Sequence, residues 1–477
     1  MGPFNKPRRV LIAATIFTFC LYLSLDRWTQ FPWVAEPSAT QVVCPQSPLL
    51  DEILVVLRTG ATEAHEKLPI QFQTVLTCIP NLVIYSDFEE DIAGHHLHDV
   101  LDEVDEEIRR SNPDFELYNK LRANGRDGLG DYQTLFGSGG GGAMDNPGWK
   151  LDKWKFLPMV DRALRHRPQA KWFVFVEGDT YLVWQNMLEW LSRFDPEKPH
   201  YLGKQVYIGD VFFGHGGSGF VLSNPAMQQV SQRWTENKAE IEAYTAEQWA
   251  GDMVLGKVIK DVGIDMLWSF PNLQGDSPTT LDWNVSKLDR EPWCFAPTTF
   301  HHLNRLEYEA LWRFEWRWLV GHPGSSPRFG DVFKGVVLPQ LRERRDSWDN
   351  MAVGEEHSAE MFGKLSEGDR GNLTYAEKQA PGSFEGCRTL CECTRDCIQF
   401  SFSPGRCVTS AELRLGHSAD APCREYSNAA SRCLKPVVPI NGSSSDQFIQ
   451  SGWMMDRVSK YVERLDGSCA DLVEWIS

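Results

Sequence analysis

The sequence predicts an α/β fold built on a mostly parallel sheet. Three apolar runs, at residues 53–57, 82–85 and 172–176, have the composition of strands that are buried on both faces. Helical periodicity fills the intervals between them, over residues 65–76 and 149–165, and it predicts a further helix from Tyr181 to Leu191 after the third run. Strands that alternate with helices in this way form βαβ units, whose strands run parallel.

Polar residues follow each of these strands directly. They are Thr59 and Gly60 after the first strand, Asp87 after the second, and Glu177, Gly178 and Asp179 after the third. The carboxyl ends of parallel strands meet at one edge of the sheet, where α/β proteins bind their ligands. Carboxylates there suit a divalent cation, which often bridges the phosphate oxygens of a substrate. A solvated acidic turn is the alternative, but a strand buried right up to two acids needs a compensating partner.

Two later segments offer further polar groups. The run GHGGSGFVLS at residues 214–223 places Gly216, Gly217 and Ser218 before an apolar strand. Its glycines predict backbone packed against a ligand or another strand, and an ordinary hairpin turn is the alternative. Asp252 opens an apolar helical run, so it is either the cap of that helix or a carboxylate base aimed into a site.

Two adjacent histidines, His301 and His302, follow a possible strand near residue 299. Histidines in such a place are more often surface or satisfied core residues than ligands. Combined with a carboxylate site, one of them becomes a candidate metal ligand.

Length and charge set outer limits on the function. The 477 residues suffice for two domains. Acidic residues exceed basic ones, and the formal net charge is −17. This balance argues against a nucleic acid partner, because a phosphate backbone needs a basic face.

The 12 cysteines are unevenly placed, and seven of them lie between residues 387 and 433. Zinc ligation and disulfides are the two competing interpretations. The segment has one C-x-C and lacks two C-x-x-C units, which favours disulfides in an oxidising compartment. We therefore expect a small disulfide-rich module at residues 383–477, with residues 324–382 as a linker that packs on the first domain. The pairing of the cysteines stays open.

The N-terminus predicts a membrane anchor. Residues 1–9 are basic and would form a cytosolic tail. Residues 10–28 would form the anchor, and the first sixteen of them, Val10 to Leu25, carry no charge. Residues 29–48 have the composition of a stem. A signal anchor is favoured over a cleaved signal peptide, because bulky residues follow where a cleavage site would need small ones. The rest of the chain would then be luminal, and Asn284, Asn372 and Asn441 would be glycosylation acceptors.

Taken together and in order, these motifs resemble glycosyltransferase family 31. The motifs are strand-TG, strand-D, a strand followed by ExD-TY, DPExPxYxG, GGSGFVLS, GDxxLG and TFHH. The likeness is to the core 1 β-1,3-galactosyltransferase and Fringe branch in its filamentous-fungal form, and it spans roughly Leu49 to Asn304. The cysteine-rich segment resembles a PAN/Apple module.

The resemblance implies a GT-A catalytic domain at residues 49–323 that uses a UDP-sugar and Mn²⁺. It assigns Asp179 as the direct metal ligand, with Glu177 and His301 beside it and His302 as an option. It assigns Asp252 as the catalytic base. The nucleotide-sugar contacts would be Thr59, Gly60, Asp87, Lys155 and Glu177, and the loop beside donor and acceptor would be Gly216, Gly217 and Ser218.

This chain departs from the family pattern at two positions. The family has three consecutive aspartates, where this chain has Glu177, Gly178 and Asp179. The family has an acid before the base, where this chain has Gly251.

The function implied is inverting transfer of a hexose from a UDP-galactose or UDP-N-acetylhexosamine type donor. The acceptor would be a hydroxyl of a glycan or glycoprotein, the bond would be of the β-1,3 type, and the enzyme would reside in the Golgi membrane. A catalytically dead transferase acting as a binding protein is the alternative. A glycosidase with two carboxylates fits less well, since it has no use for metal ligands. The donor, acceptor and oligomeric state stay open.

Overall fold

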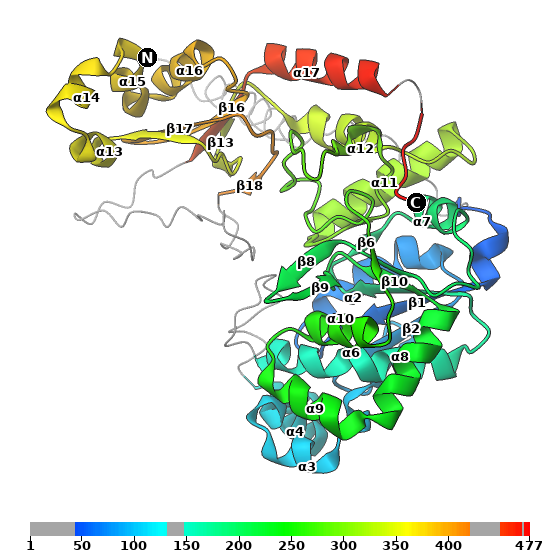
Figure 1. Cartoon of the computed structure of the whole chain (residues 1–477). Helices are drawn as coiled ribbons and strands as arrows, with labels where there is room; N and C mark the ends of the chain where they lie inside the picture. The colour runs from blue at the N-terminus through cyan, green and yellow to red at the C-terminus, as the bar shows by residue number, and fades with distance from the viewer. Residues whose placement is uncertain (1–42, 131–146, 420–448, 470–471) are drawn as a thin grey trace, which may run out of the picture. The chain divides into compact units, whose positions relative to one another are not determined.

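The computed structural model describes residues 43–130, 147–419, 449–469 and 472–477 (Figure 1). The elements below all belong to one compact unit, Pro45–Ser477. Its largest sheet has eight strands in the order β11-β7-β10-β5-β1-β2-β4-β3. Their bounds are β1 Ile53–Arg58, β2 Leu82–Ser86, β3 Glu90–Ile92, β4 His95–Asp99, β5 Trp172–Glu177, β7 Tyr201–Gly203, β10 Phe220–Ser223 and β11 Met266–Trp268.

The centre of this sheet is parallel, as the sequence predicts. β1 pairs in parallel with both β2 and β5, and β2 pairs in parallel with β4. β10 is antiparallel to β5 and β7, and β3 is antiparallel to β4. This mixed but parallel-rich α/β architecture fits the expected GT-A fold.

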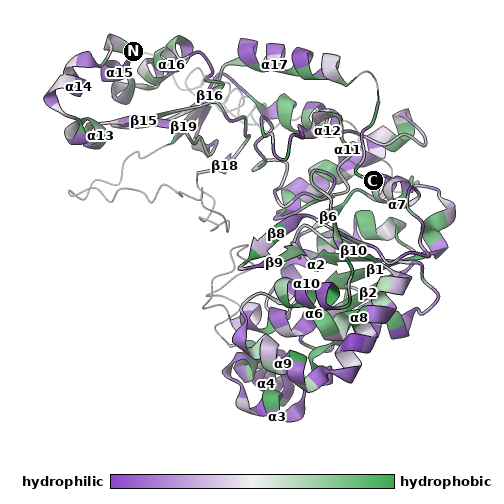
Figure 2. Cartoon of the chain, viewed as in Figure 1, coloured by the Kyte–Doolittle hydropathy of each residue, from purple (hydrophilic) through white to green (hydrophobic). Residues whose placement is uncertain are grey.

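Helices cover both faces of the sheet. Their bounds are α2 Ala64–Phe72, α3 Glu106–Ser111, α4 Glu116–Asn124, α6 Pro147–His166, α7 Trp184–Leu191, α8 Asn224–Glu236, α9 Lys238–Glu247 and α10 Gly251–Asp261. Figure 1 shows α6, α8 and α10 together on one side of the sheet. They share a core with Leu54, Val56, Phe173 and Phe175, which point to that side by strand alternation. Figure 2 shows hydrophilic and hydrophobic residues on the same helix in α8 and α9, as expected of helices with one buried side.

The register of the central strands aligns their carboxyl ends. Arg58, the last residue of β1, lies opposite Glu177 in β5 and Tyr85 in β2. The turns that follow these strands therefore start at the same level. This alignment is what gathers the predicted strand-end residues at one edge.

One local prediction was wrong, and one alternative interpretation is not met. A helix was expected from Tyr181 onward, but Tyr181–Leu182 forms strand β6, and α7 begins only at Trp184. β6 pairs with β12 (Thr299–Phe300), so a tertiary contact overrides the local helical periodicity. The glycine run does not make a hairpin either. Strand β9 (Val211–Gly214) before it pairs with β8 (Gln205–Ile208), whereas β10 after it joins the main sheet.

The C-terminal part is built around a second, antiparallel sheet of five strands. Its strands are β13 Arg345–Asp346, β19 Gln450–Trp453, β16 Gln399–Ser403, β17 Arg406–Ser410 and β15 Glu355–Ser358. The other elements after α10 are β14 Trp348–Asp349, β18 His417–Ser418, α11 Arg305–Gly321, α12 Phe329–Val332, α13 Ala359–Lys364, α14 Glu367–Asn372, α15 Tyr375–Gln379, α16 Phe384–Cys393 and α17 Met455–Ser468. β13 and β15 come from the predicted linker, so strands from both sides of residue 383 share this sheet. The domain boundary there stays a prediction.

Disulfides are present in this part, in agreement with the cysteine pattern. Cys387 is bonded to Cys407 and Cys391 to Cys397, and both bonds lie in the small core between α16 and its sheet. A further disulfide joins Cys294, just before β12, to Cys469 at the end of α17.

Hydrogen bonds accompany that long-range disulfide. Trp190 Nε1 donates to the carbonyl of Ile476 over 2.7 Å, and Trp293 Nε1 donates to Asp466 Oδ1 over 2.9 Å. The last helix and the residues that follow it are therefore attached to the rest of the chain by covalent and polar contacts.

The predicted transmembrane helix is contradicted. Among the described residues, no helix is both long enough and apolar enough to span a bilayer. Such a helix needs about 20 mostly apolar residues, whereas α6, the longest one described, carries charges including Lys150, Asp161 and Arg165. The predicted Golgi-membrane localisation and membrane partner fall with it. The segment chosen for the anchor, residues 10–28, lies outside the described residues, as do residues 1–9 and most of the predicted stem.

A buried acid supports the β6–β12 pair from α11. Glu315 is 2% exposed, and its Oε2 accepts a hydrogen bond from Tyr181 Oη over 2.7 Å. Burial raises the pKa of Glu315 from 4.5 to about 7. As pH rises between these values, the unfolded chain releases the proton while the folded chain keeps it. Glu315 therefore makes folding less favourable as pH increases across this range.

We expect Glu315→Gln to remove this pH dependence, because an amide accepts the Tyr181 hydrogen bond without charge. We compare the unfolding free energy of the variant minus that of the wild type at the two pH values. This difference should be about 1–3 kcal/mol more favourable to the variant at pH 8 than at pH 5. Urea unfolding at both pH values measures the difference, with the partly exposed Glu309→Gln on the same helix as control. An equal effect of Glu315→Gln at pH 5 and pH 8 would contradict the argument.

Candidate active site

The acidic turn after β5 lies at the edge where the central strands end. The backbone N–H of Gly178 donates to the carbonyl of Arg58 over 3.1 Å, and Gln71 Nε2 of α2 donates to the Gly178 carbonyl. These bonds fix the turn to β1 and α2. As a result Asp179, which is 5% exposed, has its carboxylate buried at the strand ends.

The two histidines meet this carboxylate because β12 pairs with β6. His301 Nε2 lies 3.1 Å from Asp179 Oδ1 and 3.7 Å from Glu177 Oε2. His302 Nδ1 lies 3.8 Å from Asp179 Oδ2. The N–H of Leu303 donates to the Asp179 carbonyl over 3.2 Å, which holds the histidine turn against the acidic turn.

The residues of this cluster fit a divalent cation. Asp179, His301 and His302 each offer a ligand atom, and these atoms lie within 4.8 Å of one another. Within the described part of the chain, no donor makes a well-formed hydrogen bond to Asp179 Oδ1, although His301 Nε2 is close to it. A buried carboxylate oxygen in this situation is costly unless a cation or donor satisfies it. Carboxylate and imidazole together suit Mn²⁺ and similar ions.

Two cations that the sequence reasoning missed also face the acids. Arg58 Nη2 pairs with Glu177 Oε1, and Lys67 Nζ lies 3.0 Å from Asp179 Oδ2. Burial raises the pKa of Asp179, but Lys67 and His301 more than offset it and hold that pKa well below its usual range. Burial lowers the pKa of His301, whereas Asp179 and Glu177 raise it to a net value of about 9. The site thus holds positively and negatively charged side chains together, largely shielded from solvent.

The predicted nucleotide contacts come together beside this cluster. Lys155 Nζ lies 2.8 Å from Asp87 Oδ2 and donates to the carbonyl of Thr59 over 2.8 Å. The N–H of Ala61 donates to Asp87 Oδ1 over 2.7 Å. A Cβ at Gly60 would lie 2.9 Å from Asp87 Oδ2, so the close approach requires glycine. Lys155 and Asp87 are 0% and 1% exposed, so they support the turn after β1 from its buried side. Direct contact of these two residues with a nucleotide stays a prediction.

Asp252 is the second residue of α10 and does not cap it. The N-cap is Ala250. The Asp252 carboxylate accepts hydrogen bonds from the N–H groups of Gly216 and Met253, each with a donor–acceptor distance of 2.9 Å. Burial raises the pKa of Asp252 to about 6, although the bond from Gly216 lowers it. This value is that of a carboxyl group able to exchange a proton near neutral pH.

The glycine before Asp252 is required by packing. A Cβ at Gly251 would lie 2.5 Å from the Cα of Lys153 and 2.5 Å from Phe156 Cδ2. α10 therefore packs against α6 at a distance that only glycine allows. The acid that the family has at this position would not fit here.

The loop from Gly216 to Ser218 connects Asp252 with the histidines. Gly216 donates to Asp252, and the carbonyl of Gly217 accepts a hydrogen bond from Thr180 Oγ1 over 2.7 Å. The carbonyl of Ser218 accepts one from Thr299 Oγ1, just before the histidines, over 2.6 Å. The loop thus places the candidate base and the candidate metal ligands on one short stretch of backbone.

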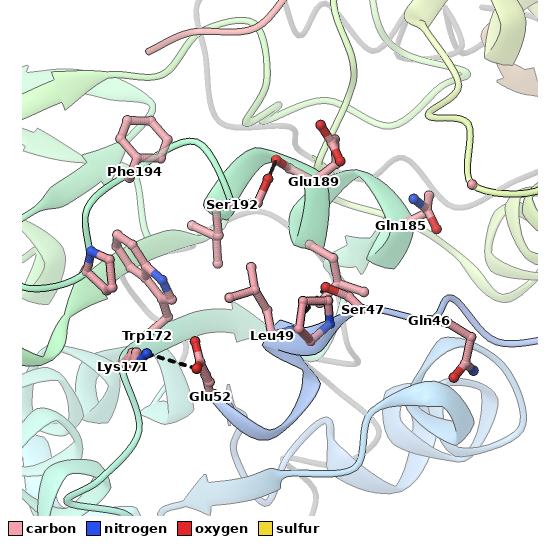
Figure 3. A pocket seen from close by; sticks show the side chains of 15 residues that line it. Gln46, Ser47, Leu49, Glu52, Lys171, Trp172, Gln185, Glu189, Ser192 and Phe194 are labelled. Carbon is pink, nitrogen blue, oxygen red and sulfur yellow. Dashed lines mark hydrogen bonds and ion pairs between the residues drawn. The ribbon is translucent and has the colours of Figure 1, made fainter.

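The remaining predicted positions lie elsewhere. Asn284 and Asn372 are exposed, as glycosylation acceptors must be, and Asn441 lies outside the described residues. A cavity of about 480 Å³ is lined by Leu49, Glu52, Lys171 and Trp172, among others. Figure 3 shows these side chains. The cavity lies where β1 and β5 begin, at the opposite ends of the strands from Asp179. The residues discussed above do not line it, so we do not assign it to the site.

Residues 157–273 match the family model described as Fringe-like. The matched region contains β5 with the acidic turn, the glycine loop and Asp252. This supports a glycosyltransferase of the family 31 type. The match ends before His301 and before the cysteine-rich part, so the PAN/Apple resemblance is not confirmed.

Gly217→Ala should disturb the candidate metal cluster specifically. A Cβ at position 217 would lie 2.1 Å from His301 Cε1 and 2.4 Å from His301 Nε2, so the imidazole must leave its present position, in which Nε2 lies 3.1 Å from Asp179 Oδ1. We expect Mn²⁺ affinity, measured by calorimetric titration, to fall at least tenfold. Gly178→Ala is the matched control, because a Cβ there makes only ordinary contacts of 3.4 Å or more. Unchanged Mn²⁺ affinity in a folded Gly217→Ala variant would remove His301 from the cluster.

Proposed function

We propose that this chain is an inverting, metal-dependent glycosyltransferase. It moves a hexose from a UDP-galactose or UDP-N-acetylhexosamine type donor to a hydroxyl of a glycan or glycoprotein and forms a β-1,3-type bond. The observation that carries the proposal is the loop from Gly216 to Ser218. It joins a carboxylate of raised pKa, Asp252, to the buried Asp179–His301 pair. The loop and both carboxylates lie within the Fringe-like part of the chain, and His301 follows it.

The donor diphosphate would lie at the carboxyl ends of β1 and β5. Asp179, His301 and His302 would hold a Mn²⁺ ion, which when bound acts as a Lewis acid that offsets the charge developing on the departing UDP. Lys67 and Arg58 add two fixed positive charges at the same edge. Their geometry is set by ion pairs before substrate arrives, as electrostatic stabilisation requires.

Asp252 would serve as the base for the acceptor. Its carboxylate takes the proton of the acceptor hydroxyl while that oxygen forms a bond to the anomeric carbon. The bond from this carbon to the phosphate oxygen breaks, and UDP leaves with the electron pair. A single displacement of this kind inverts the anomeric centre. The N–H of Gly216 orients the carboxylate through Oδ2, which fixes the direction from which it can accept the proton.

The nucleotide would lie on the β1 turn. Lys155 holds the carbonyl of Thr59, and Asp87 holds the N–H of Ala61, so Thr59 and Gly60 have a fixed backbone. A rigid backbone at the strand end lowers the entropy lost when the ligand binds.

UDP binding should require Mn²⁺ and Asp179. We expect calorimetric titration of UDP into the purified protein to give binding with Mn²⁺ and at least tenfold weaker binding without it. Asp179→Ala should abolish this difference, because it removes the carboxylate that His301 faces. Asp210→Ala, at an exposed acid of the β8–β9 turn, is the control and should bind as the wild type does.

The outcomes separate the two candidate functions. Mn²⁺-dependent UDP binding with hydrolysis or transfer of a UDP-sugar supports the transferase. Binding with no turnover of any UDP-sugar would identify a binding protein with a transferase fold, and no binding by the folded protein would refute both.

Asp252→Asn should retain UDP binding and lose transfer by a factor of about 10²–10⁴, which is the usual contribution of a general base. In the wild type the base must be ionised, and the pKa of about 6 means that it is protonated below this pH. We therefore expect kcat to fall about tenfold for each pH unit below 6, and residual activity of the variant to lack this acid limb. An active variant with the same pH profile would place the base elsewhere.

A further inference from the structure

The hairpin of β3 and β4 forms the outer edge of the main sheet and carries a histidine-rich sequence. Its register places Asp91 opposite His96 and Glu90 opposite Leu97. Side chains alternate along a strand, so His96 and His98 share one face. Glu89 and Asp91 lie on that same face of the neighbouring segment.

Contacts among these four side chains are short. His96 Nε2 lies 2.6 Å from Glu89 Oε1, and His96 Nδ1 lies 2.9 Å from Asp91 Oδ1. His98 Nδ1 lies 3.8 Å from the same Glu89 oxygen. The ring centroids of the two histidines are 4.6 Å apart. One ligand atom each from Glu89, His96 and His98 can be chosen so that all lie within 4.8 Å of one another.

The opposite face of the hairpin is occupied by other contacts. His95 stacks on Phe72 with ring centroids 3.9 Å apart, and Glu90 pairs with His65 and Arg126 over 2.9 and 2.7 Å. These residues therefore point away from the cluster. Because side chains alternate along β3 and β4, one face of the hairpin packs on the protein. On the other face the acids and the imidazoles lie close to each other.

The carboxylate at the centre of the cluster is held in place. Glu89 Oε2 accepts a hydrogen bond from the backbone N–H of Asp99 over 2.7 Å, which leaves Oε1 turned toward both histidines. Such a second hydrogen bond is what orients carboxylate ligands in metal sites. The exposed fractions of the side chains are 53% for Glu89, 45% for His96 and 38% for His98, so an ion reaches them directly from solvent.

We propose that this face of the β3–β4 hairpin, comprising Glu89, His96, His98 and Asp91, binds a transition-metal cation of the Zn²⁺ class. Two imidazole nitrogens with carboxylate oxygens suit Zn²⁺, Co²⁺, Ni²⁺ and Cu²⁺, and they suit the oxygen-seeking Mg²⁺ and Ca²⁺ poorly. Two neighbouring acids supply the negative charge that a divalent ion needs. The bound ion would link β4, which carries both histidines, to Glu89, the residue directly before β3. This inference does not depend on the proposed transferase activity, because it uses none of the residues assigned to it.

Zn²⁺ titration in the Asp179→Ala background tests the site, since that substitution removes the carboxylate ligand of the other candidate cluster. We expect calorimetry on the full chain to detect a Zn²⁺ site that His96→Ala and His98→Ala each weaken at least tenfold. His95→Ala is the matched control in the same strand and should leave this affinity unchanged, because its ring packs on Phe72. Co²⁺ in place of Zn²⁺ should give visible absorption bands that disappear in the same two variants. Equal Zn²⁺ affinity in all variants would overturn the proposal.

A second measurement needs no substitution. Zn²⁺ should slow the modification of His96 and His98 by diethylpyrocarbonate in the wild-type protein, as read by mass spectrometry. The exposed His322 serves as internal reference and should react at the same rate with and without Zn²⁺. Unchanged reactivity of His96 and His98 at saturating Zn²⁺ would also overturn the proposal.

Discussion

The ion pair between Arg58 and Glu177 is the interaction on which the candidate site depends. It joins the last residues of β1 and β5, which are opposite each other in the parallel register. Arg58 also lies 3.1 Å from Asp152 of α6, and its guanidinium carbon lies 4.4 Å from the ring centre of Phe156. One buried cation thus connects two strands and a helix. Without Glu177, the buried Arg58 would lose the partner that it meets at the strand ends, and the partly buried Glu177 would lose its strongest partner without Arg58.

Around this pair the site is assembled from segments far apart in the chain. The acidic turn follows β5, the base begins α10 and the histidines follow β12. Two devices bring them together, namely the pairing of β6 with β12 and the glycine loop that carries hydrogen bonds to both sides. Neither the short β6–β12 pair nor the glycine loop is stable by itself, and the main sheet holds each in place. The geometry of the site is therefore a property of the tertiary fold.

The sequence predicts features that depend on local pattern, and it does not predict features that depend on contacts between distant segments. The central strands and their polar ends were predictable, because a continuous apolar run that ends in acids is typical of a buried strand reaching a ligand-binding edge. The positions of Asp179, His301 and Asp252 followed from motif order. Arg58 and Lys67 were missed as site residues, since a cation near a strand end or on a helix looks like any solvated charge until its acidic partners are placed. Glu63, four residues before Lys67, indicates from the sequence that Lys67 forms an ion pair on one face of its helix.

Other errors have the same origin. Tyr181 and Leu182 fit a helical pattern but form a strand, because the partner that pairs with them lies beyond residue 298. Gly251 is a departure from the family motif, and its cause is the close packing of two helices, which no single segment reveals. The apolar N-terminal run satisfied a composition rule for a membrane anchor, and no described helix meets the requirements for one.

The disulfide between Cys294 and Cys469 has a consequence for biosynthesis. The two cysteines are 175 residues apart, so at ordinary translation rates the second follows the first from the ribosome by about 10 to 35 seconds. During that interval the segment that carries β12 and the histidines lacks its covalent partner, although the sheet it must join is already synthesised. The final cross-link of the site therefore waits for a segment that contributes no side chain to the chemistry.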